Sequence, residues 1–261
     1  MIQRLMQRKN LKYLLPLVMG AMVVLGFKWF GPEEEKEAVI FSLVRDALTN
    51  VHLQPKEVDD ALSEQVYENY LNTLDYNKLF LTQNEVAQLA GYKKELDNLF
   101  QLGDTRFFTL SYGLITYSID ASEKIYRQLL SEPFDYTLDE RIGNNPESRT
   151  FAQNNEEHVE FWRKHLKWRV LNRVYEKDRA QKDDAETDET VELKSFETLE
   201  SEAREKELEL QNEWREDLMD VSRLEWFGMY MNAYCEAFDP HTSYLAPQQN
   251  EDFELSMTGQ F

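Results

Sequence analysis

Cysteine, glycine and proline are all scarce in this sequence of 261 residues. The single cysteine, Cys235, excludes an internal disulfide framework and a cysteine-rich zinc module. The 9 glycines and 7 prolines are too few for a β-sandwich that turns about every ten residues, and they suit long helices. Because 42% of the residues are hydrophobic and 13% aromatic, the chain can bury the core of one substantial domain or two small ones. The composition therefore predicts an all-α fold.

Basic residues are also in short supply. The chain has 29 lysines and arginines against 49 aspartates and glutamates, which gives a formal net charge of −20. A surface of this sign repels the phosphates of a nucleic acid, and no basic stripe interleaved with aromatic residues occurs beyond the N-terminus. We therefore expect no nucleic acid partner.

The N-terminus has the pattern of an export signal. Four basic residues open it, namely Arg4, Arg8, Lys9 and Lys12, and an uncharged run follows over residues 13–27. We predict a signal peptide or signal anchor over residues 1–30, with the rest of the chain exported across the membrane. Cleavage after Gly26 and retention in the inner membrane through residues 13–30 both stay open, because the run is short for a span of about twenty residues.

Beyond the N-terminus the apolar residues recur at three- and four-residue steps, which is the period of a helix. A first helix is predicted over residues 56–74. A capping box, residues 82–85, precedes a second helix that we expect to continue to Phe100. A third helix is predicted over residues 104–129. Residues 131–155 contain helix-breaking clusters and predict a surface connection.

The second half of the chain is predicted to be helical on either side of an acidic stretch. An apolar stripe runs from residue 156 to residue 174. Residues 177–198 lack periodic apolar positions and predict a solvated acidic linker. Apolar spacing then returns over residues 199–238 and fits either one long helix or two. A second capping box, Ser222 with Glu225, favours two helices.

Two histidines, His158 and His165, lie on the helix predicted after residue 156. They are seven residues apart, which is about two turns and too far for both to bind one ion from a straight helix. We interpret them as partly exposed side chains among charges. A metal-dependent hydrolase that also uses His241 remains an alternative, and it would require tight metal binding.

The segment CEAFDPHTSYLAP, residues 235–247, concentrates polar side chains at the end of the last predicted helix. His241 and Ser243 could share a face of an extended chain. However, a hydrolytic triad needs three groups that converge in space, and the chain has neither a nucleophile elbow nor a Ser-x-x-Lys pair. We assign no catalytic, cofactor-binding or metal-binding residue in this chain.

A structural turn explains the same segment better. Asp239 and Pro240 stop the helix, and Asp, Thr and Ser side chains can bond the local backbone. Tyr244 and Leu245 are then expected to pack back on the core. Cys235, on the last predicted helix, is expected to be buried.

The residues of this turn carry a specific resemblance. Together with EDFELSMTGQF after it, the turn resembles the segment that leads into the PDZ domain of tail-specific proteases, the periplasmic carboxy-terminal processing peptidases. The matching residues are Asp239, Pro240, His241, Thr242, Ser243, Tyr244, Leu245 and Pro247, with Phe253, Met257 and Gly259 downstream. Residues 70–86 and 160–171 also resemble segments of this family. The likeness is weakest between residues 176 and 199, where this chain is unusually acidic.

The resemblance implies a helical N-terminal domain over residues 38–247 and a connector over residues 248–261 into a PDZ domain. The alternation of LSMTGQF predicts the start of a strand. In the family a serine nucleophile and a lysine base follow the PDZ domain, so these two residues are expected beyond Phe261. The chain is thus expected to be an N-terminal part of such a protease and inactive alone.

The resemblance also implies a function for the parent protein, which is to cleave exported polypeptides from their C-terminal side. The expected partners are protein substrates with exposed C-termini and an adaptor protein, both docked by the helical domain. The alternative is a non-enzymatic, membrane-tethered helical scaffold that binds partners through its acidic face.

Overall fold

The computed structural model describes residues 33–143, 145–188, 190–246 and 255. Within this part of the chain there are eight α-helices and no β-strand, so the all-α prediction is confirmed. The helices are α2 (Glu33–Asp46), α3 (Asp60–Leu74), α4 (Gln83–Ala90), α5 (Leu96–Leu102), α6 (Arg106–Leu130), α7 (Asn155–Thr187), α8 (Phe196–Asp220) and α9 (Arg223–Phe238), with a short π-helical turn η2 (Ala47–Val51) and a 3-10 turn η3 (Pro146–Ser148). The predicted signal segment, and the connector apart from Leu255, lie outside the described residues.

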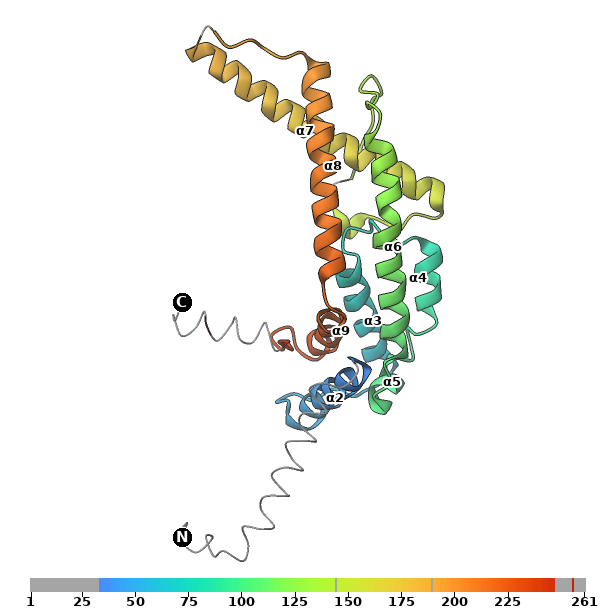
Figure 1. Cartoon of the computed structure of the whole chain (residues 1–261). Helices are drawn as coiled ribbons and strands as arrows, with labels where there is room; N and C mark the ends of the chain where they lie inside the picture. Colours follow the sequence, from blue (N-terminus) through green and yellow to red (C-terminus); the bar gives the residue numbers. More distant parts are fainter. Residues whose placement is uncertain (1–32, 144, 189, 247–254, 256–261) are drawn as a thin grey trace, which may run out of the picture.

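The helices form an elongated bundle (Figure 1). Helices α6 and α8 pack side by side along the long axis, and α7 crosses them obliquely at one end. At the other end α9 packs against α3 and α2, close to α5. In the part of the chain that is described, no helix is long and apolar enough to cross a lipid bilayer.

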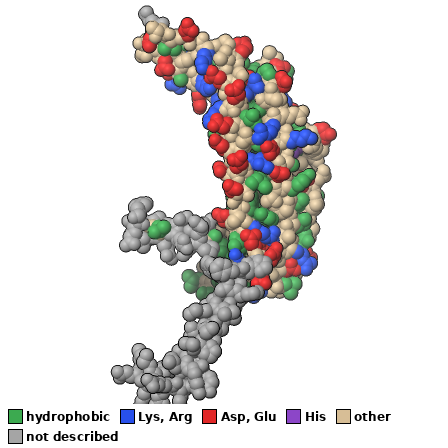
Figure 2. Space-filling model, viewed as in Figure 1, with side chains coloured by type: hydrophobic (Ala, Val, Ile, Leu, Met, Phe, Trp, Pro, Cys, Tyr) green, Lys and Arg blue, Asp and Glu red, His purple; other side chains and the backbone are tan. Residues whose placement is uncertain are grey.

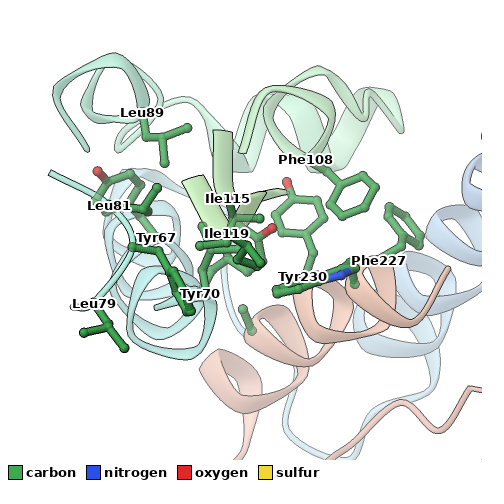
Figure 3. Close-up of a cluster of buried hydrophobic side chains, with 14 of the residues drawn as sticks. Tyr67, Tyr70, Leu79, Leu81, Leu89, Phe108, Ile115, Ile119, Phe227 and Tyr230 are labelled. Carbon is green, nitrogen blue, oxygen red and sulfur yellow. The ribbon is translucent and has the colours of Figure 1, made fainter. Parts of the chain in front are cut away.

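The core is unusually aromatic where α3, α6 and α9 meet (Figure 3). Tyr70 and Tyr230 pack edge to face with their ring centroids 5.0 Å apart, and Phe108 meets Phe227 at the same distance and in the same manner. Edge-to-face pairs of this kind contribute about 0.5–1.5 kcal/mol beyond the area they bury. These contacts tie the last helix to the first half of the chain.

Both predicted capping boxes are present and set helix starts. At α4 the backbone N–H of Thr82 donates to the Glu85 carboxylate at 2.9 Å, and at α9 that of Ser222 donates to the Glu225 carboxylate at 2.8 Å. The second box ends the ambiguity in the predicted region 199–238, which forms two helices that break between Asp220 and Arg223. The backbone N–H groups in the first turn of a helix have no acceptor within the helix, and a capping side chain supplies one.

Replacing Ser222 by alanine is expected to lower the free energy of unfolding by about 1 kcal/mol, because the first turn of α9 loses its side-chain acceptor. Urea denaturation followed by circular dichroism measures this change. Ser222→Asp keeps an acceptor at the cap and should stay close to the parent. An alanine variant as stable as the parent would show that the cap contributes nothing to α9.

The helix predicted from Thr82 to Phe100 is interrupted over residues 91–95 and so forms two helices, α4 and α5. The reason lies outside the segment. Ser63, buried on α3, donates its hydroxyl to the carbonyl of Lys93 at 3.0 Å and accepts the N–H of Leu96 at 2.7 Å. The Ser63 side chain therefore completes the turn between α4 and α5. Because Ser63 lies on α3, the apolar spacing within residues 82–100 does not predict this turn.

The start of α3 and the presence of α2 also differ from expectation. The first predicted helix begins at Asp60 rather than residue 56, because the carboxylate of Asp59 accepts the N–H of Leu62 at 2.9 Å and caps it there. Helix α2 was not predicted. It buries Phe41 completely, edge to face with Phe100 at 5.7 Å between ring centroids.

The acidic stretch 177–198 is not a linker throughout. Helix α7 continues to Thr187 and α8 begins at Phe196, so of the described residues in this stretch only 188 and 190–195 are non-helical. The end of α7 projects beyond the bundle (Figure 1), and both acidic and basic side chains cover it (Figure 2). Ion pairs one turn apart support it without a core, since Lys182 Nζ lies 2.6 Å from the Asp178 carboxylate. An exposed helix needs no apolar stripe, which is why periodicity missed it.

Candidate functional site

A turn bonded by its own backbone and side chains follows α9. Helix α9 ends at Phe238, and the N–H of Thr242 donates to the carbonyl of Asp239 at 3.0 Å, with Pro240 at the second position of the turn. The Asp239 carboxylate accepts the N–H of His241 at 2.7 Å. Proline at this position presets the backbone, and an aspartate side chain that bonds two residues on stabilises the turn. We call residues 239–246 the exit turn.

The exit turn is fixed to two other parts of the chain. The hydroxyl of Thr242 lies 3.1 Å from Nε2 of His52, which follows η2. Lys56 donates its ammonium to the carbonyl of Ala237 at 2.6 Å, so a cation satisfies the C-terminal end of α9. The segment between α2 and α3 therefore holds the turn from one side.

Asn232 holds the exit turn from the other side. Its side-chain oxygen accepts the N–H of Tyr244 at 2.7 Å, and its side-chain nitrogen donates to the carbonyl of Tyr244 at 3.0 Å. One amide thus satisfies both backbone groups of Tyr244, as a neighbouring strand would. The ring of Tyr244 packs beside Gly228, where a β-carbon would lie 3.5 Å from it.

The predicted packing of the turn is right for Tyr244 and wrong for Leu245. Tyr244 packs against the core, and its burial raises the pKa of its hydroxyl. Leu245 is 40% exposed, because the two-point bond at Tyr244 fixes the backbone and the next side chain points the other way. Cys235 is buried as predicted, and burial raises the pKa of its thiol to about 11. Pro247 lies outside the described residues.

Replacing Asn232 by alanine is expected to speed hydrogen exchange at the Tyr244 amide at least tenfold, because the two bonds that hold this backbone are lost together, each worth about 0.5–1.5 kcal/mol. Hydrogen exchange followed by NMR measures this locally. Amides in the middle of α6 serve as the internal control and should not change. Equal protection of Tyr244 in both proteins would contradict the clamp.

The structure does not gather the three histidines; it corrects the predicted exposure of His158, whereas His165 is partly exposed as predicted. His158 is buried, and its Nε2 lies 2.7 Å from the carbonyl of Leu79. His165 packs among aromatic rings, and burial, reinforced by Arg169, lowers its pKa to about 4. His241 is exposed in the exit turn. Among the described residues no group of three or more potential metal ligands occurs.

Pattern analysis missed several buried carboxylates, because it assigns charges to the surface. Asp75 follows α3, and its two oxygens accept three backbone N–H groups, from Leu79, Phe80 and Leu81, each at 2.9 Å. This one side chain shapes the loop into α4. Glu207 of α8 is fully buried, and Arg169 and Arg173 of α7 bond its carboxylate. The cluster of Glu207, Arg169 and Arg173 joins α7 to α8.

These features define an all-α domain in which the last helix and the turn after it are bound to the segment that precedes α3. The sequence-family model that describes the tail-specific protease N-terminal domain matches residues 44–248, which is most of the chain. The protein therefore belongs to the tail-specific protease family, represented here by its N-terminal domain.

A curated relative agrees with this assignment. The chain is similar to a tail-specific protease of Haemophilus influenzae, with 24% identity over 222 residues. The aligned region covers 81% of this chain and 28% of the relative. The chain thus spans about a quarter of the length of that protein.

Proposed function

We propose that this chain is the helical docking part of an exported serine-type carboxy-terminal processing protease. The observation that carries the proposal is the family match over residues 44–248, because it covers the bundle from the end of α2 to the exit turn. The basic flank and uncharged run of residues 1–30 support export to the periplasm. The protease chemistry itself belongs to the serine and lysine that the family places after its PDZ domain.

The bundle supports a docking role by its construction. The exit turn is bonded to α9 through Asn232 and to the segment before α3 through His52. A domain joined to the C-terminal side of the exit turn would therefore be attached at a fixed point on the bundle. A partner polypeptide held on the bundle would be kept at a fixed position relative to that point, which raises its local concentration there.

The test is the lifetime of a periplasmic reporter protein with an apolar C-terminal tag. The gene is altered so that its product lacks residues 38–261 and keeps the export signal, and pulse-chase labelling follows the reporter. We expect the half-life to lengthen as far as in a strain without the gene. An unchanged half-life would contradict the proposal and favour the membrane-tethered scaffold.

A further inference from the structure

Four large apolar side chains converge on one groove without being covered. Leu138 is 53% exposed, Trp168 and Leu171 are each 41% exposed, and Phe196 is 44% exposed. They come from the connection after α6, from α7 and from the first residue of α8, and they line a cavity of about 260 Å³. Single exposed apolar residues are ordinary, whereas a cluster in a hollow marks a binding surface. We call this cavity the α7 groove.

The groove is positively charged in a strongly acidic protein. Arg141, Lys164 and Lys167 line it, with Glu140 as the one carboxylate. Glu140 is already engaged, because hydrogen bonds from Arg163 and Lys167 lower its pKa to about 2. Among the described residues Arg141 has no ion pair, and Lys164 makes only a 3.6 Å contact with a carboxylate on its own helix. Two cations at the rim are thus available to a partner.

One basic residue and three apolar residues follow one face of α7. Lys164, Trp168 and Leu171 lie at the spacing i, i+4 and i+7, and Tyr175, 66% exposed, continues this face at i+11. From residue 164 to residue 175 this face is about 16 Å long at the rise of an α-helix, and its apolar part, residues 168–175, covers about 10 Å of that length. A strip of this length and spacing fits the apolar face of a second helix lying along it.

We propose that the α7 groove docks an acidic amphipathic helix of a partner protein, with leucine or phenylalanine anchors. The inference rests on the proposed docking function and names the surface and the chemistry of the partner. Charge complementarity decides the occupant: acidic flanks meet Arg141 and Lys164, and the anchors enter between Trp168 and Phe196. A second copy of this chain fits worse, since a twofold contact would bring the two basic rims together.

The test uses two labelled helical peptides of about 18 residues with identical apolar anchors at i, i+4, i+7 and i+11, one flanked by glutamates and the other by lysines. Fluorescence anisotropy measures their Kd for the folded chain. We expect the acidic peptide to bind and to weaken with added salt, and Arg141→Glu with Lys164→Glu to weaken it at least tenfold. Trp168→Ala should also weaken it.

Matched controls lie outside the groove. Lys206→Glu reverses an exposed charge on α8, and Tyr117→Ala removes an aromatic ring that is 74% exposed on α6, so neither should change the Kd. Circular dichroism confirms that every variant is folded. Equal binding of both peptides, absence of binding, or self-association through the groove in sedimentation would overturn the inference. The cellular half-life test would stand unaffected by any of these results.

Discussion

Replacing Glu207 by alanine is expected to destabilise the protein by about 3 kcal/mol, the low end of the range for breaking a buried ion pair. The Glu207 carboxylate is fully buried between α7 and α8, where Arg173 Nε lies 2.8 Å from one oxygen and Arg169 bonds the other. Gln211 donates its side-chain amide to the same carboxylate at 2.8 Å. Removing the carboxylate leaves two cations facing each other. Both keep about a third of their surface in water, which limits the cost.

Urea denaturation at neutral pH measures the effect. The matched control is Glu209→Ala on the same helix, where an exposed ion pair with Lys206 is lost. Exposed pairs contribute at most about 1 kcal/mol, so the control should change little. Equal losses in the two variants would show that Glu207 does not join α7 to α8 in the way described.

The second large effect is a loss of stability in acid that comes from His165. Its folded pKa of about 4 lies below the ordinary value of 6.5, because burial disfavours the charged ring and Arg169 and Arg149 repel it. The folded state therefore holds His165 neutral while the unfolded state binds a proton below pH 6.5. Protonation of His165 therefore leaves the free energy of unfolding unchanged above that pH. As the pH falls towards about 4, it lowers the free energy of unfolding by a total of about 3 kcal/mol.

The measurement compares the free energy of unfolding of the parent and of His165→Leu at several pH values between 7 and 4. Many carboxylates titrate in the same range, so the difference between the two proteins isolates the histidine. We expect this difference to move in favour of the variant as the pH falls. Parallel pH profiles would contradict the pKa and its cause.

The sequence alone predicts the helices whose starts are written locally. Thr82 and Ser222 each begin a capping box whose other half is the glutamate one helical turn later, and both boxes form. The exit turn is predicted for the same reason, because Asp239 and Pro240 decide it between them. A cap or turn whose donor and acceptor lie within four residues of each other can be predicted from the sequence, because these groups are already neighbours along the chain.

The features that the sequence could not predict depend on partners far along the chain. Ser63 breaks a helix about thirty residues away, and Asn232 fixes Tyr244 across a turn. Glu207 and His158 are buried because bonding partners arrive from other segments. A pattern analysis places such polar residues at the surface, because burying one costs free energy until a partner is known.

We propose that this bundle docks polypeptides for a protease of the tail-specific family. The most direct measurement compares two substrates of the purified full gene product, a long tagged protein and a short peptide with the same C-terminus. We predict that a product without residues 38–261 has a strongly raised KM or no activity on the long substrate and an unchanged kcat/KM on the short one. The proposal would be contradicted if the deletion variant cleaved each of the two substrates at the same rate as the full gene product.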